Sequence, residues 1–346
     1  MALQRFPGFI DMHVHLREPG ATNKEDFASG SRAAIKGGFT FVCDMPNNPG
    51  CPTISSERLN EKVSLADSKA LCDTGFHFGT DGHNLASFGA VIRDPHVFGL
   101  KVYCGKTTGD LMITDPVALD AIFAAWESDK PILVHAQGDI LGECVDLAAH
   151  YHRRIHICHV VTQDDVGRVK TAKEHNLIIT CGVTPHHLFL TEGDVAKLGA
   201  FALFKPPIGS KQDQEMLWES IQTGIIDIIE SDHAPHTKEE KVHSTPCFGV
   251  PGLETTIPLL VHAIVEKKLT TDKMIDLLYT KPKKIFTIPD QPNTFIELDP
   301  VKPYVVGSTG YETKCGWSPF DGWELSGCIE RVVLRGKLLV DGGKIV

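Results

Sequence analysis

Short apolar runs alternate with amphipathic stretches along most of the chain. Eight of the apolar runs have the length of β-strands, at residues 8–15, 40–45, 75–80, 99–104, 131–136, 155–160, 177–183 and 225–232. The amphipathic stretches between them predict helices at 25–36, 55–69, 116–128, 139–151, 163–175 and 212–223. Thr162, followed by Asp164 and Asp165, is typical of the start of a helix.

Eight strands that are apolar almost throughout, each followed by a helix, predict an α/β protein with a parallel sheet closed into a TIM-type (β/α)8 barrel. A doubly wound open sheet is the alternative. Residues 254–281 add two further helical segments, and the pattern then changes to short strands, the last two joined at residues 341–343. We expect a barrel over residues 8–285 and a small β-structure made of residues 1–7 and 286–346.

The composition narrows the class of protein. The chain has 346 residues and a formal net charge of −10, which argues against a nucleic-acid-binding surface. No apolar run is long enough to cross a membrane, and the first residues lack a signal peptide. The ten cysteines form no C-x-x-C pair and lie in apolar segments, which is typical of free thiols in a reducing compartment. We therefore expect a cytoplasmic enzyme with a small-molecule substrate.

Candidate metal ligands lie where the predicted strands end, which is where barrel enzymes carry their chemistry. His13 and His15 are two residues apart and so project from the same face of the first strand. Taken alone, such a pair is more often structural than metal-binding. However, His135, His159 and Asp232 lie near the ends of three further strands. Nitrogen and carboxylate ligands without thiolates favour Zn²⁺.

Lys101 lies near the end of the fourth strand, where an ammonium group cannot bind a metal and burial is unfavourable unless the charge is paired. As a neutral amine it could add CO₂ and become a carbamate, a carboxylate able to bridge two metal ions. A lysine paired with an acidic side chain is the simpler interpretation of the residue alone.

Several motifs resemble those of dihydroorotases in the amidohydrolase superfamily. The most specific are H-V-H-L-R-E-P-G at residues 13–20 and S-D-H-A-P-H at residues 231–236; supporting ones lie at residues 24–30, 184–188 and 251–255. The resemblance extends from about residue 7 to the end of the chain. It is strongest to the dihydroorotase domain of the multifunctional pyrimidine-synthesis polypeptide of animals and to fungal dihydroorotase-like relatives.

This resemblance implies a binuclear zinc site in an amidohydrolase-type barrel. His13, His15 and Asp232 would bind one zinc ion, His135 and His159 the other, and carboxylated Lys101 would bridge the two. The implied reaction is the reversible cyclisation of N-carbamoyl-L-aspartate to L-dihydroorotate in pyrimidine biosynthesis, with Asp232 as the general base and then acid.

The resemblance also implies the substrate-binding residues. Arg17 and Asn47 would hold the substrate α-carboxylate, for which the planar guanidinium is well suited. His236 would contact the ring, and Lys205 and Thr107 would complete the site. Alternatively, Arg17 is a surface residue paired with Glu18 or Asp26, and Asn47 is a turn residue.

Three positions depart from the family pattern. Gly182 occupies a place where family members usually have a glutamate near the metal pocket. Lys205 replaces an arginine or asparagine, and Thr108, after the matching Thr107, replaces a phenylalanine in the active-site loop. The alternative functions are therefore an inactive dihydroorotase-like domain kept for structure or assembly, and a related cyclic amidase of the dihydropyrimidinase or allantoinase type. By resemblance we expect a homodimer, which could form part of a larger pyrimidine-synthesis polypeptide, with no nucleic-acid or membrane partner.

Overall fold

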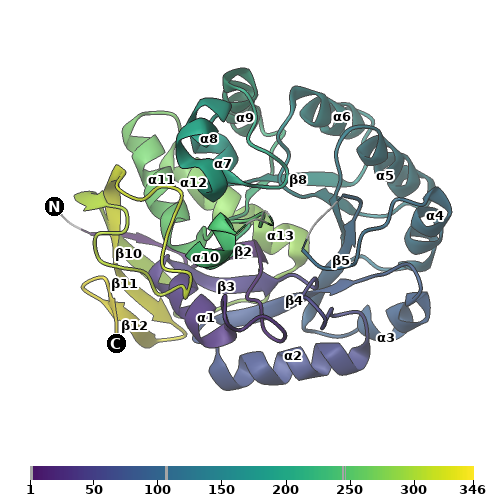
Figure 1. The fold of residues 1–346 in the computed structure, drawn as a ribbon, viewed down its shortest axis with the longest axis horizontal. Helices are drawn as coiled ribbons and strands as arrows, with labels where there is room; N and C mark the ends of the chain where they lie inside the picture. Colours follow the sequence, from purple (N-terminus) through teal and green to yellow (C-terminus); the bar gives the residue numbers. More distant parts are fainter. Residues whose placement is uncertain (1–2, 106–107, 244, 246) are drawn as a thin grey trace.

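Eight parallel strands form a nearly closed barrel at the centre of the molecule (Figure 1), as the sequence predicts. The computed structural model describes residues 3–105, 108–243, 245 and 247–346. The barrel strands follow chain order from β2 to β9, and a parallel bridge between Val14 and His233 brings the two ends of the sheet together. The strands are β2 (Phe9–Val14), β3 (Phe39–Asp44), β4 (Asp73–Gly79), β5 (Val97–Tyr103), β6 (Ile132–His135), β7 (Ile155–Ile157), β8 (Ile179–Val183) and β9 (Ile228–Ile229).

Helices surround the barrel (Figure 1), and the six predicted from the sequence are all present. The Thr162 side chain caps α6 by accepting from the Asp165 amide, as expected. In the described part of the chain, no helix combines the length and apolarity needed to cross a membrane. The α-helices are α1 (Phe27–Lys36), α2 (Ser56–Lys69), α3 (Phe88–Val91), α4 (Pro116–Ala125), α5 (Gly138–His150), α6 (Gln163–Glu174), α7 (Pro185–Phe189), α8 (Glu192–Leu198), α9 (Lys211–Thr223), α10 (Lys238–Val242), α11 (Leu253–Val265), α12 (Thr271–Ile275) and α13 (Lys281–Phe286). Short 3₁₀ segments η1 (Leu85–Ser87) and η2 (Gly199–Ala202) and the π-helical η3 (Asp276–Thr280) complete the set.

A five-stranded antiparallel sheet lies beside the barrel and contains both ends of the described chain (Figure 1). Its order is β1-β10-β11-β12-β13, so the N-terminal strand pairs with a strand from the C-terminal region. The strands are β1 (Gln4–Phe6), β10 (Phe295–Val305), β11 (Glu324–Leu334), β12 (Lys337–Asp341) and β13 (Lys344–Ile345).

Along the barrel strands, the side chains that point into the barrel are apolar in the interior and become polar toward the C-terminal end of the strand. Leu133 on β6 belongs to the interior cluster, and His135 follows it two residues later. Ile228 on β9 belongs to the same cluster, and Glu230 and Asp232 follow at the same spacing. Because the side-chain period of a strand is two, the packed core places these polar groups at the C-terminal mouth of the barrel.

Candidate metal centre and substrate pocket

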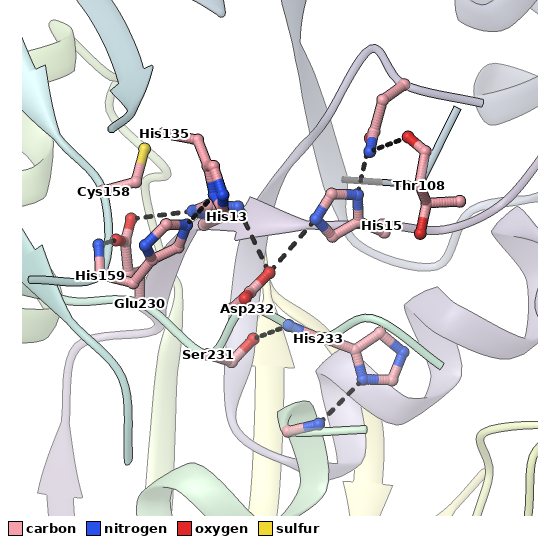
Figure 2. A network of polar contacts seen from close by, with 12 residues as sticks. His13, His15, Thr108, His135, Cys158, His159, Glu230, Ser231, Asp232 and His233 are labelled. Atoms are coloured by element: carbon pink, nitrogen blue, oxygen red, sulfur yellow. Dashed lines mark hydrogen bonds and ion pairs between the residues drawn. The ribbon is translucent and has the colours of Figure 1, made fainter. Parts of the chain in front are cut away.

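A pocket opens at the C-terminal ends of the barrel strands (Figure 2). Five of the six predicted metal ligands line it, whereas Lys101 is buried and does not contribute to the lining. Three predicted substrate residues line it too, namely Arg17, Asn47 and Lys205. The full lining is His13, His15, Arg17, Asn47, Tyr103, Thr108, His135, His159, His186, Phe204, Lys205, Asp232, Ala234, Phe248, Gly249 and Val250.

Asp232 is the meeting point of the first group of predicted ligands (Figure 2). Its Oδ1 atom lies 3.3 Å from His13 Nε2 and 3.2 Å from His15 Nε2. One potential ligand atom from each of His13, His159 and Asp232 lies within 4.8 Å of the others. Imidazole nitrogens and a carboxylate oxygen that converge in this way form a donor set suited to Zn²⁺. His13, Cys158 and Glu230 form a second such group.

His135 and His159 form the other half of the cluster. His135 Nδ1 lies 3.0 Å from His159 Nε2, and the ring centroids are 4.7 Å apart. The remaining ring nitrogen of His159, Nδ1, is buried without a hydrogen-bond partner among the described residues. The two rings therefore present facing nitrogens at the place where the resemblance implies the second metal ion.

Two acceptors fix the orientation of the imidazoles on the first strand. His13 Nδ1 lies 3.2 Å from Glu230 Oε2, and His15 Nδ1 lies 2.9 Å from Asn47 Oδ1. Because both partners are acceptors, each ring donates its Nδ1 hydrogen and turns Nε2 toward Asp232. Metal-binding histidines are commonly held by their other ring nitrogen in this way.

The burial and charges of the cluster set its protonation. Burial lowers the pKa of His15 to about 3 and that of His135 to about 3, so both rings are neutral at pH 7. Burial would also lower the pKa of His13, but the carboxylates of Asp232 and Glu230 outweigh it and raise this pKa to about 10. Burial opposes ionisation of Asp232, yet the nearby His13 and His15 lower its pKa below the usual range. Asp232 therefore remains an ionised carboxylate.

The backbone is strained at three residues of the site. Arg17, His159 and Asp232 have φ values of 63°, 37° and 45°, in the left-handed region that residues with a β-carbon rarely adopt. All three lie just after a barrel strand. Such conformations cost about 1–3 kcal/mol each and are concentrated at functional sites.

Lys101 is completely buried, and its Nζ atom donates to Cys158 Sγ at 2.9 Å. Its Nζ atom also lies 5.1 Å from the centroid of the Tyr103 ring. Among the described residues, no carboxylate lies within 4.0 Å of this amine. The described part of the chain therefore does not supply the acidic partner that the simpler interpretation of Lys101 requires.

Arg17 is buried, in contrast to the surface position considered as an alternative. Its Nε donates to the carbonyl oxygen of Pro235 at 3.2 Å, and Nη2 lies 3.3 Å from His236 Nε2. The Asn47 amide donates to the Thr108 carbonyl oxygen at 2.9 Å. Arg17 and Asn47 line the pocket, whereas His236, predicted to contact the substrate ring, contacts Arg17 and does not contribute to the lining. Thr107, also predicted to bind substrate, lies outside the described residues.

A buried lysine connects the loops that carry Arg17 and Asn47. Lys62 on α2 forms an ion pair with Asp44 Oδ2 at 2.6 Å, although the angle is not that of an aligned hydrogen bond. It also donates to Met45 O at 2.7 Å and to Asn48 Oδ1 at 2.9 Å. Asp44 Oδ1 in turn accepts from the Leu16 amide at 2.7 Å. This network supports the segments after β2 and β3 from below the pocket.

Glu230 is a functional candidate that the sequence analysis does not identify. It is fully buried, and its carboxylate lies against Gly182 at the end of β8. It lies two residues before Asp232, within the strand predicted from the sequence at residues 225–232, where side-chain alternation would place both carboxylates on the same face. That spacing is the signal from which Glu230 could have been found.

The ligand atoms that this site offers, imidazole nitrogens and a carboxylate oxygen, are of the kinds that bind zinc, so the residues are suited to hold two zinc ions. Four imidazoles and Asp232 converge, Lys101 is buried without an acidic partner among the described residues, and His159 retains an unpaired ring nitrogen. His13, His15 and Asp232 would hold one ion and His135 and His159 the other.

Residues 6–276 match the Amidohydrolase family. Over 99% of its length the chain is 40% identical to the Multifunctional protein CAD of Squalus acanthias and 39% identical to the Multifunctional protein pyr1-3 of Dictyostelium discoideum. It spans only 15% of the length of each of these relatives. It is also 30% identical to the Dihydroorotase of Halobacterium salinarum, with 98% of this chain and 87% of that protein covered.

Solved structures show the same fold. An L-hydantoinase (dihydropyrimidinase) from Arthrobacter aurescens superposes with a TM-score of 0.94 at 23% identity, covering 99% of this chain and 87% of that chain. The inactive dihydroorotase-like domain of the Chaetomium thermophilum CAD-like multifunctional protein gives a TM-score of 0.85 at 24% identity, covering 100% and 97%. With the family match, the barrel defines the class as the amidohydrolase-type (β/α)8 barrel. The chain belongs to the amidohydrolase family, and within it to the dihydroorotase group.

Proposed function

We propose that the chain is a dihydroorotase, which interconverts N-carbamoyl-L-aspartate and L-dihydroorotate. One observation carries this proposal: Arg17 lines the same pocket as Asp232 and the histidine cluster. A substrate anchored through a carboxylate at Arg17 would have its amide beside the reacting groups. The similarity to a dihydroorotase over most of both chains supports the same substrate.

The proposed cofactor is a pair of zinc ions held by the four histidines and Asp232 and bridged by carboxylated Lys101. When bound, zinc would supply the Lewis acidity that activates water and polarises an amide carbonyl. The burial of Lys101 without a neighbouring carboxylate in the described structure supports carboxylation, because a carbamate would replace an unpaired buried cation with an anion that binds metal.

The residues of the chain would position the substrate and move the proton. Arg17 and Asn47 would hold the α-carboxylate, His236 would contact the ring, and Lys205 and Thr107 would contribute to the remaining contacts. In the hydrolytic direction a water oxygen adds to the ring amide carbon and the carbon–nitrogen bond breaks. Asp232 accepts the proton of that water and delivers it to the departing nitrogen. Ring closure follows the same steps in reverse.

Arg17 favours this substrate over those of other cyclic amidases. A buried arginine that faces a pocket needs an anionic partner, and the planar fork of its guanidinium suits a carboxylate. Rings without a carboxylate would leave the charge uncompensated. The similarity to hydantoinase structures, at identities of 20–23%, shows a shared fold and says nothing about the substrate.

The proposed setting is a cytoplasmic pyrimidine-synthesis pathway. We propose a homodimer that functions as part of a larger polypeptide, as the multifunctional relatives suggest. We also propose that the barrel unit comprises residues 8–285 and that residues 1–7 and 286–346 form one β appendage.

The test is turnover by the purified chain after zinc loading, followed by the ultraviolet absorbance of dihydroorotate in both directions. We expect turnover, and we expect Asp232→Asn to abolish it. Absence of turnover in a chain shown by metal analysis to contain zinc would refute the proposal and favour the inactive, structural alternative. Turnover of dihydrouracil or hydantoin in place of dihydroorotate would favour the related cyclic amidases.

A further inference from the structure

The Glu230 carboxylate contacts two predicted metal ligands from beneath the pocket (Figure 2). Its Oε2 atom accepts from His13 Nδ1 at 3.2 Å, and its Oε1 atom accepts from the backbone amide of His159 at 2.5 Å. The carboxylate is completely buried, and His156 Nε2 lies 3.7 Å away. One side chain just after β9 therefore connects His13 at the end of β2 with His159 in the segment after β7.

The absence of a side chain at Gly182 creates the space for this carboxylate. A β-carbon at position 182 would lie 2.6 Å from Glu230 Oε1 and 2.7 Å from its carboxyl carbon. Non-bonded contacts this short are essentially never made by a β-carbon, and Glu230 could not move aside without losing its two hydrogen bonds. Position 182 is also one of the three departures from the family pattern, where relatives usually have a glutamate.

We propose that Glu230 is a positioning residue of the metal centre. From the position just after β9 it supplies the buried carboxylate for which Gly182 on β8 leaves room, and it fixes His13 through its ring and His159 through its backbone. The inference rests on the proposed metal site. It does not require that the substrate be dihydroorotate.

The two contacts act on different features of the ligands. The contact with His13 fixes the ring so that Nε2 faces Asp232. The contact with His159 holds the amide of a residue that lies two positions after the end of β7 and has a φ of 37°. Without an acceptor, this strained backbone would relax and the His159 ring would turn away from His135. Both effects would reduce metal binding by the four histidines and Asp232. If Glu230 instead held an ion itself, together with His13 and Cys158, the zinc stoichiometry would reveal it.

The test compares three variants by zinc affinity, zinc stoichiometry and the amide proton shift of His159. Glu230→Ala removes both acceptors, whereas Glu230→Gln keeps the volume but leaves only one acceptor oxygen. Gly182→Asp combined with Glu230→Ala restores a carboxylate from β8. Ordinary bond lengths place an aspartate oxygen about 2.4 Å from its β-carbon, close to the 2.6 Å that separates Glu230 Oε1 from a β-carbon at 182. Glu254→Ala is the matched control, because this carboxylate is 6% exposed and accepts from the amides of Glu312 and Thr313.

We expect Glu230→Ala to weaken zinc binding by about 10- to 100-fold, the range found for residues that orient metal ligands, and to move the His159 amide proton upfield. Glu230→Gln should fall in between, the double variant should recover both readouts, and Glu254→Ala should lower stability alone. Unchanged affinity in Glu230→Ala would overturn the proposal. So would a loss of one zinc ion with unchanged affinity for the rest, which would show that Glu230 is itself a ligand, or a double variant no better than Glu230→Ala.

The outcomes also separate this inference from the proposed function. Normal zinc binding without turnover of dihydroorotate would refute the function and leave the role of Glu230 to be decided by zinc affinity. If the unmodified chain bound no zinc, the metal centre and the proposed function would fail together. The His159 amide shift in metal-free protein would then still show whether Glu230 fixes this backbone.

Discussion

Lys62 offers the sharpest test of how the pocket is supported, because its side chain is fully buried and makes three polar contacts. Lys62→Met keeps a side chain of similar length, so little cavity is formed and the change is mainly polar. Hydrogen bonds from a charged group contribute about 1.5–3 kcal/mol each, so the bonds to Met45 and Asn48 amount to about 3–6 kcal/mol. Removing one partner of a buried ion pair costs about 3–5 kcal/mol. These estimates overlap, and we expect the free energy of unfolding to fall by about 3–5 kcal/mol.

Urea unfolding followed by fluorescence measures this loss. With slopes of about 1–3 kcal/mol/M, the unfolding midpoint of Lys62→Met should fall by on the order of 1 M. The matched control is Arg58→Met on the same helix, which removes a surface ion pair with Glu61 at 2.8 Å. Exposed pairs contribute little, so its midpoint should stay close to that of the unmodified chain. If the two variants had the same midpoint, the buried network would not support the pocket in the way we infer.

Three further predictions concern the site and its surroundings. Arg17→Met should raise KM for dihydroorotate by about 10- to 100-fold, from the loss of a charged hydrogen bond, with zinc content unchanged; an unchanged KM would rule out the carboxylate anchor. Burial lowers the pKa of Lys241 to about 8, below its unfolded value, so between pH 8 and 10 the unfolded chain binds the extra proton. The stability of the unmodified chain relative to Lys241→Met should therefore rise with pH by up to about 1.4 kcal/mol per pH unit, and a flat difference would contradict the shift. Removal of zinc by a chelator should lower Tm, since a ligand at 100 times its Kd stabilises by about 2.7 kcal/mol per site; an unchanged Tm would contradict a metal site formed only in the folded chain.

The order of strands and helices could be predicted from the sequence because each barrel strand is almost wholly apolar and each is followed by an amphipathic helix. The strand β10 is different. It contains Pro300 and Pro303, which argue against a regular strand because proline lacks an amide hydrogen. In the structure, the pairing of β10 with β11 is irregular between Asp299 and Pro303, which accommodates the prolines. This irregularity depends on the partner strand, so the local sequence of β10 does not predict it.

The part of the candidate site that lies at the C-terminal ends of the barrel strands could be predicted from the sequence. His13, His15, His135, His159 and Asp232 were identifiable from this position, and the structure places them around one pocket. The role of Glu230 is harder to predict from the sequence. Its carboxylate lies against Gly182, which is 48 positions earlier in the chain, and no local pattern connects the two residues. The space left by Gly182 and the carboxylate of Glu230 appear unrelated in the sequence until both are placed in the structure.

The pairing of β1 with β10 has a mechanical consequence. Gln4, Arg5 and Phe6 form a three-residue edge strand, and two residues separate it from β2, which leads directly to His13 and His15. Tension applied at the N-terminal side of β1 would first peel this strand from the small sheet. Once those few pairs had opened, the load would pass to a strand of the barrel itself. The edge pairing is therefore the first contact that such tension would break, before any load reached the barrel strand that carries His13.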